Sequence, residues 1–191
     1  MLEYLIPSKT RRKILSLFFS DIDASYHLRR VGREVNEEIN AVKRELDILT
    51  NGKILKKEKR LNKVIYTIND KYIFFNEFLR IIFKENYFTQ QLLKNLSRLG
   101  KIKFICISEK FLKKQKIAKG EVYLLIVGIV VIPEIITIIS SAEQKMGFEI
   151  NYTVMTEEEL AFRKKNNDPF LWGFLKQPKF MIIGEESELM K

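Results

Sequence analysis

Apolar residues recur with helical spacing three times before residue 52. The first predicted helix begins after Ser8, whose hydroxyl can accept a hydrogen bond from the first turn. The second covers 27–35, after a loop at 21–25, and the third covers 37–50. Four apolar residues of the third helix are spaced to form one buried stripe: Ile39, Val42, Leu46 and Leu49. The remaining side chains of this helix are therefore expected to face away from the core.

Two short strands are predicted next, at 53–55 and 64–68. In the second strand, Val64, Tyr66 and Ile68 share one face because side chains alternate along a strand. The connecting segment 56–63 is rich in Lys and Arg. Three helices followed by a charged β-hairpin, in this order, are typical of a winged helix-turn-helix. That fold places its third helix in the major groove of DNA and its hairpin against phosphates.

Two further helices are predicted at 71–86 and 87–99, and Gly100 ends the second. The helix at 71–86 is too rich in Phe and Ile for a free linker. We expect it to pack on the preceding helices and on a second copy of the chain. The resulting domains are 1–86, a winged helix-turn-helix with a packing helix, and 87–191.

Strands and helices alternate after Gly100. Strands are expected at 102–108, 121–128, 148–155 and 179–183. Helices are expected at 133–146, from Thr156 onward and at the end of the chain, with a basic helix or loop at 109–119. This alternation predicts a small α/β domain with a mixed sheet, so that the fold class of the whole chain is α+β. The apolar run at 122–133 is shorter than the ~20 residues needed to cross a membrane.

The charge is concentrated in the first half of the chain. The formal net charge is +10; residues 1–100 hold 20 Lys and Arg against 12 Asp and Glu, whereas residues 101–191 hold 14 against 12. This asymmetry indicates a polyanionic partner for the first half, although a solvated basic surface has the same composition. The single cysteine, Cys106, allows no intrachain disulfide. Without a visible leader peptide, a cytoplasmic location is expected.

Double-stranded DNA is the partner that this pattern favours, bound by a homodimer whose two-fold axis matches a palindromic site. Three residues on the exposed face of the third helix are candidates for base contacts: Asn40, Lys43 and Arg44. Six cations are candidates for phosphate contacts: Lys59, Arg60, Lys63, Arg11, Arg12 and Arg29. The only histidine, His27, is expected at the surface or near phosphate, because one His does not make a metal site.

The whole chain resembles a group of prokaryotic proteins in which an ArsR-like winged-helix domain is joined to a small nucleotidyltransferase-like domain. The first domain is similar along 7–15, 28–31 and 42–55. The second is similar along 104–108, 121–128, 149–156, 167–170 and 178–184. The resemblance implies a regulator whose second domain has the nucleotidyltransferase fold.

The sequence departs from that family where the chemistry would occur. Active members carry Gly-Ser after the first strand, and here the positions are Ile107 and Ser108. They also carry three carboxylates on the next two strands, to hold divalent metals. The matching residues here are Glu121, Tyr123 and Asn151. One carboxylate in place of three does not clamp two metals. We therefore expect no enzyme activity, no metal and no cofactor.

Two other functions stay open at this stage. The first is a divergent, metal-dependent nucleotidyltransferase of a toxin–antitoxin pair that uses Glu121. The second is a winged helix that binds protein, since Glu37 and Glu38 at the start of the third helix would repel phosphates. The inactive domain would serve dimerisation or sensing of an unknown nucleotide or small molecule. The lysines of 110–119 are either a second phosphate contact or a solvated surface.

Overall fold

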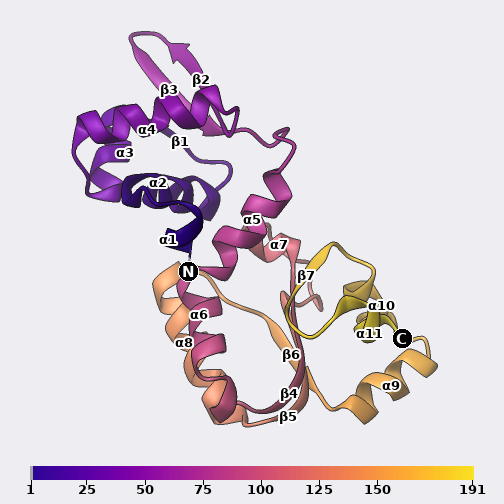
Figure 1. Ribbon diagram of the computed structural model, residues 1–191. Helices are drawn as coiled ribbons and strands as arrows, with labels where there is room; N and C mark the ends of the chain where they lie inside the picture. The colour runs from indigo at the N-terminus through magenta and orange to yellow at the C-terminus, as the bar shows by residue number, and fades with distance from the viewer. Residues whose placement is uncertain (1) are drawn as a thin grey trace. The chain divides into compact units, whose positions relative to one another are not determined.

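The computed structural model describes residues 2–191 and shows a mixed α+β fold with two sheets (Figure 1). The chain divides into two compact units, Met1–Glu85 and Asn86–Lys191. Within the described residues, no helix is long and apolar enough to cross a membrane. The two units are described separately below.

The helices of the first unit are α1 (Leu2–Leu5), α2 (Lys9–Ser20), α3 (Leu28–Val35), α4 (Ile39–Asn51) and α5 (Phe75–Lys84). As predicted, Ser8 caps α2: its hydroxyl accepts a hydrogen bond from the Arg11 amide at 3.2 Å. Asn36 ends α3 in the left-handed region, with φ of 48°. This conformation lets the chain turn within three residues and begin α4.

The sheet of this unit has the order β1-β3-β2, and both strand pairs are antiparallel. Its strands are β1 (Ser25–His27), β2 (Leu55–Arg60) and β3 (Lys63–Ile68). The predicted loop at 21–25 therefore ends one residue too late, because Ser25 already belongs to β1 and pairs with β3. The strand β1 itself was not predicted. His27 ends β1 and caps α3, since its Nδ1 accepts a hydrogen bond from the Arg30 amide at 3.2 Å.

The core of the first unit lies between the three central helices and one face of this sheet. Ile14 and Phe18 of α2 and Val42 and Leu46 of α4 are fully buried. Ile39 is 39% exposed, so the predicted stripe on α4 is buried only from Val42 onward. Ile39 starts the helix and lies over Gly32 of α3, where an added Cβ would come within 2.9 Å of its Cδ1.

Helix α5 is shorter than the predicted 71–86, because turns occupy the residues between β3 and Phe75. It packs on α2, and the rings of Phe19 and Phe75 stack with centroids 5.8 Å apart. The structure thus confirms the expected contact with the preceding helices.

The second unit contains a four-stranded mixed sheet of order β6-β5-β4-β7, in which β5 and β6 are parallel and the other pairs antiparallel. Its strands are β4 (Gly100–Ser108), β5 (Leu124–Val130), β6 (Tyr152–Met155) and β7 (Lys179–Ile183). Its helices are α6 (Tyr87–Lys94), α7 (Glu109–Leu112), α8 (Ile132–Met146), α9 (Glu157–Lys165), α10 (Pro169–Leu175) and α11 (Glu186–Met190), with a 3-10 turn at Leu96–Arg98.

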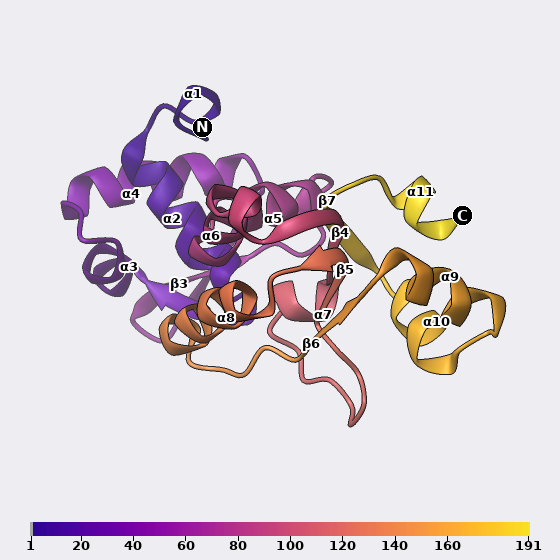
Figure 2. The ribbon, with the colours of Figure 1, turned by 90° about the horizontal axis from the view of Figure 1, so that it is seen from below.

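Helices cover both faces of this sheet (Figure 2). Helices α6 and α8 lie on one face, and α9, α10 and α11 lie on the other. Alternate residues of β4 serve the two sides: Phe104 and Cys106 belong to the core beneath α9–α11, and Ile105 and Ile107 are buried on the opposite side. Burial raises the pKa of Cys106 to about 12, so the thiol is inert.

Several predicted boundaries in this unit are wrong. The strand expected at 148–155 begins at Tyr152, and α10 was not predicted. Of the two alternatives for 109–119, a helix occupies only Glu109–Leu112, and the rest is loop. The strand expected to end near Gly128 continues through it to Val130. Gly128 has φ of 142° opposite an irregularity in β4, so its missing side chain allows the two strands to stay paired.

We predict that Gly128→Ala destabilises the second unit by roughly 2–3 kcal/mol, because a Cβ there would lie 2.2 Å from the Lys101 carbonyl oxygen. The matched control is Gly173→Ala in α10, where nothing lies within 4 Å of the added Cβ. This control should be neutral or stabilising by up to about 1 kcal/mol. Chemical denaturation measures both, and equal stabilities would contradict the strained geometry at Gly128.

Candidate nucleic-acid interface

One face of α4 carries the residues that the sequence singled out for base contacts. Asn40, Lys43 and Arg44 are all exposed, as their three- and four-residue spacing predicts. Within the described chain, neither Lys43 nor Arg44 has a carboxylate within ion-pair distance. Asp47 follows on the same face and is half-buried. The face therefore presents two unpaired cations and one amide at its N-terminal end.

Two carboxylates near α4 are turned toward α2 and are neutralised there. Glu45 accepts hydrogen bonds from the Arg11 Nε at 2.7 Å and the Ser8 hydroxyl at 2.5 Å. Glu37 pairs with the Lys13 ammonium at 2.7 Å. That hydrogen bond is the main reason why the pKa of Glu37 lies below its ordinary value. These contacts remove negative charge from the exposed side of α4.

Glu38 is the N-cap of α4, and its Oε2 accepts a hydrogen bond from the Ala41 amide at 3.0 Å. The amides of Asn40 and Ala41 lower the pKa of this carboxyl. Glu38 thus has a structural role at the positive end of the helix dipole. The expected repulsion of phosphates is therefore reduced for Glu37, which has a cation partner, whereas Glu38 keeps an exposed negative charge that the helix dipole offsets in part.

Two of the predicted phosphate ligands have internal partners instead. Arg11 is paired with Glu45, and Arg12 donates from Nη1 to the Ile6 and Pro7 carbonyl oxygens at 2.5 and 2.9 Å. Both residues are half-buried. Arg29, in the first turn of α3, is exposed. Of these three cations, Arg29 is the one most readily available to a ligand.

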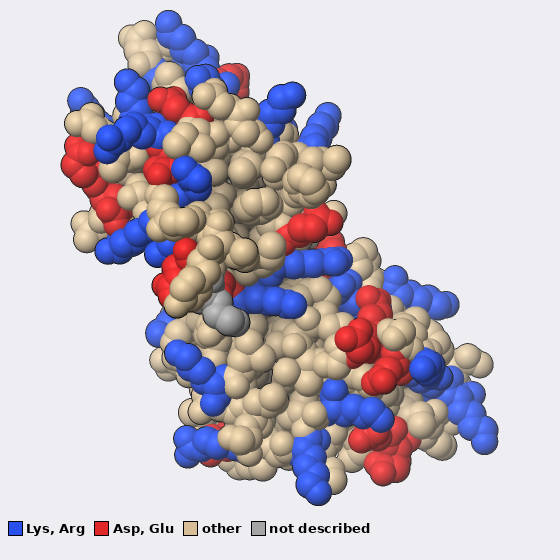
Figure 3. Space-filling view, in the orientation of Figure 1, with Lys and Arg blue, Asp and Glu red and all other residues tan. Residues whose placement is uncertain are grey.

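The β2–β3 hairpin is exposed from Lys56 to Val64. At its tip Arg60 pairs with Glu58 at 2.9 Å, whereas Lys59 and Lys63 form no ion pair within residues 2–191. Leu61, in the turn, adopts φ of 53° and is 95% exposed. Lys and Arg side chains gather over this hairpin and around the helices below it (Figure 3).

Lys57 belongs to this surface, although it was not among the predicted site residues. Side chains two apart on a strand share a face, so Leu55, Lys57 and Lys59 lie on one side of β2. Leu55 is buried, and β2 contacts α4, so this is the side that faces the helices. Residues 56–60 are all charged, so the sequence shows no apolar alternation that would have identified Lys57, and its side of β2 follows from the strand register.

The residues that match nucleotidyltransferase positions meet at one end of the second sheet. The Ser108 amide donates to the Tyr123 carbonyl oxygen at 2.8 Å, and the Tyr123 amide donates to the Asn151 carbonyl oxygen at 2.8 Å. Glu121 and Tyr123 precede β5, and Asn151 precedes β6, so these residues lie just before the strands on which they were expected. The backbones of Ser108, Tyr123 and Asn151 therefore lie side by side at this end of the sheet.

Their side chains are engaged in other contacts. Ser108 is buried and caps α7, and the Tyr123 hydroxyl donates to the Gln115 carbonyl oxygen at 2.8 Å. The Tyr123 ring packs on Phe111 with centroids 5.4 Å apart. Asn151 is exposed. No cluster of three metal-binding side chains occurs anywhere between residues 2 and 191.

Glu121, the one carboxylate among these positions, forms an ion pair with a lysine side chain. The Lys110 ammonium lies 3.0 and 2.8 Å from the two oxygens of Glu121, and the Ala118 amide donates to Glu121 at 3.0 Å. The hydrogen bond from Lys110 is the main cause of the lowered pKa of Glu121. The Lys110 ammonium therefore balances the negative charge of Glu121 from within the same protein.

We predict that Lys110→Met raises the pKa of Glu121 toward its ordinary value. Because the folded-state pKa is lowered, ionised Glu121 contributes stability that is present above its unfolded-state pKa and is lost as the pH falls through the folded-state value. The variant should lose most of this dependence and keep the part that comes from the Ala118 amide and Gln177. Carboxyl-carbon NMR titration measures the pKa, and Lys113→Met, which removes the partner of Glu109, is the control. An unchanged Glu121 pKa would contradict the pairing.

Comparison with known proteins gives no family assignment. No protein-family model matches the chain, and no curated protein matches it. Among solved structures, a mutant of ZitR from Lactococcus lactis is 18% identical with a TM-score of 0.37, covering 46% of this chain and 60% of its own. Human N-acetylserotonin methyltransferase is 15% identical with a TM-score of 0.32, covering 51% of this chain and 31% of its own. The chain thus spans less than two thirds of either match.

Proposed function

We propose that the first unit is a winged helix-turn-helix that binds double-stranded DNA and that the protein is a transcriptional regulator. In this proposal α4 enters the major groove, and the β2–β3 hairpin lies along the phosphate backbone. The observation that carries the proposal is the distribution of charge around α4. Its nearby carboxylates are paired toward α2 or cap the helix, while Lys43 and Arg44 stay exposed and unpaired.

The exposed side chains of α4 suit base recognition. Arg44 has the bidentate geometry that matches guanine, and Asn40 has the amide pair that matches adenine. Lys43 lies between them in sequence and adds a positive charge. Asp47 on the same face can accept a hydrogen bond from a cytosine amino group.

The hairpin supplies contacts that do not depend on sequence. Lys57, Lys59 and Lys63 are exposed and have no carboxylate partner in the described part of the chain. Mobile ammonium groups of this kind bind phosphate as point charges and release counterions. Arg60 joins them once its exposed pair with Glu58 is broken, which costs little at a surface.

The proposed DNA-binding form is a homodimer. A single recognition helix reads one half-site, and a symmetric pair reads two. Ile73 and Phe74 before α5 and Ile81 on α5 are 80%, 52% and 39% exposed, which suits a contact with a second copy.

We predict that Lys43→Ala with Arg44→Ala weakens binding to a selected DNA site by about thirtyfold or more, since each of the two lost base contacts contributes about 1–3 kcal/mol. Lys94→Ala with Arg98→Ala removes the same charge from the second unit and is the control. A mobility-shift titration at fixed salt measures both. Equal losses for the two double variants would contradict the assignment of α4.

Lys59→Ala is predicted to weaken binding to specific and random duplexes alike. It should also reduce the slope of log affinity against log salt concentration by about 1, because one phosphate contact releases about one counterion. Titrations at several salt concentrations give this slope. An unchanged slope would remove the hairpin from the interface.

We further propose that the second unit does not transfer nucleotides. The support is the Lys110–Glu121 ion pair, together with a buried phenol and an amide where two more carboxylates would be needed. Incubation with labelled nucleoside triphosphates and Mg²⁺ should give no transfer to protein or RNA. Label transfer that Glu121→Gln abolishes would contradict this and would establish the enzyme instead.

A further inference from the structure

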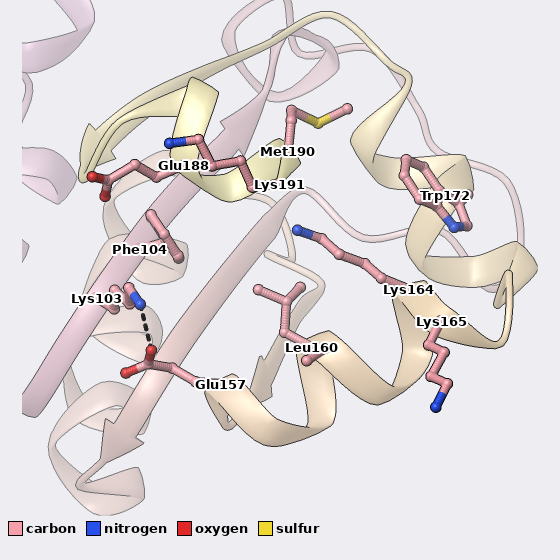
Figure 4. A pocket seen from close by; sticks show the side chains of 11 residues that line it. Lys103, Phe104, Glu157, Leu160, Lys164, Lys165, Trp172, Glu188, Met190 and Lys191 are labelled. Atoms are coloured by element: carbon pink, nitrogen blue, oxygen red, sulfur yellow. Dashed lines mark hydrogen bonds and ion pairs between the residues drawn. The ribbon is translucent and has the colours of Figure 1, made fainter.

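A cleft of about 840 Å³ lies in the second unit between α9, α11, the edge of β4 and Trp172 of α10 (Figure 4). We propose that this cleft binds a small organic anion that has one negative charge and an apolar body, of the class of a medium-chain carboxylate. The site lies wholly within residues 103–191 and is separate from the proposed DNA surface and from the Lys110–Glu121 pair.

The cleft has an apolar wall that reaches into the core. Phe104 of β4 and Leu160 of α9 line it and are only 3% and 6% exposed. Met190 and Trp172 extend this wall, and both side chains border the space in Figure 4. A wall of this kind favours an alkyl or aryl group, because burying apolar surface contributes about 25 cal/mol per Å².

Lys164 supplies a cation that has no carboxylate partner within residues 2–191. Its ammonium points into the cleft between Leu160 and Met190, and its hydrogen-bond acceptor is the Leu189 carbonyl oxygen. Burial lowers the pKa of Lys164, as expected for an ammonium that is partly withdrawn from water and bonded to a neutral carbonyl oxygen. A carboxylate in the cleft would supply the missing negative charge through a charge-assisted hydrogen bond.

The other charges of the cleft restrict the ligand to few negative charges. Lys103 is already paired with Glu157 at 2.5 Å. The carboxylate of Glu188 lies on the far side of the cleft from the Lys164 ammonium. Lys191 also lines the cleft, but in Figure 4 its ammonium lies on the Glu188 side, away from the Lys164 ammonium, so a single carboxylate beside the apolar wall needs only Lys164. An apolar wall beside the Lys164 ammonium therefore matches a ligand with one carboxylate attached to an apolar chain.

The experiment uses the full-length protein and octanoate as the probe. Trp172 is the only tryptophan of the chain and lines the cleft, so its fluorescence reports occupancy directly. Octanoate should give a saturable change with a dissociation constant in about the millimolar range or below. 1-Octanol, which has the same chain without the charge, should bind at least about tenfold more weakly, the effect expected from losing one charged hydrogen bond.

Two adjacent lysines provide matched variants. Lys164→Gln should weaken octanoate binding by about tenfold or more, because it removes the unpaired cation. Lys165→Gln should stay closer to the wild type, since Lys165 lines the cleft but its ammonium is directed away from the Lys164 ammonium in Figure 4. Thermal unfolding of both variants checks that the loss of the Leu189 contact has not unfolded α11.

Three results would overturn the proposal. These are the absence of a saturable Trp172 signal, equal binding of octanol and octanoate to the wild type, and equal effects of the two lysine variants. The comparison of octanol with octanoate needs no variant and holds even if Lys164→Gln is unstable. Because none of these measurements involves DNA, they are independent of whether the first unit binds a duplex.

Discussion

The separation of charge on α4 is the constraint on which the account of the first unit depends. Residues 37–47 include both cations and carboxylates, which could form ion pairs with one another. Glu37 and Glu45 instead pair with Lys13 and Arg11 of α2. These pairs lie beside the buried contact between the two helices, so the packing that fixes the direction of α4 also determines which charges remain exposed.

A related arrangement occurs in the second unit. The Glu121 carboxylate, at the sheet end where metals would be needed, is held by Lys110, and the neighbouring Tyr123 side chain packs on an aromatic ring. Lys164 of α9 has no carboxylate partner within residues 2–191. Paired charges mark positions with a structural role, and unpaired, partly buried charges mark positions where a ligand can bind.

Local signals predicted most of the helices. Ser8 caps α2 as expected, and α8 ends at Met146, the boundary that the sequence predicted. Pairing across the chain could not be predicted: β1 depends on β3, and Lys13 meets Glu37 from 24 positions away. Spacing also predicted that Asn40, Lys43 and Arg44 share an exposed face, but it gave no sign that Arg11 and Arg12 have internal partners.

The most direct measurement of the central claim is amide chemical-shift mapping of the isotope-labelled protein during titration with a random duplex at low salt. The account predicts salt-sensitive shifts confined to the exposed face of α4, the start of α3 and the β2–β3 hairpin. The α2 face of α4, around Glu45, should change little. Shifts that avoid α4 and the hairpin, or no shifts at all, would contradict it.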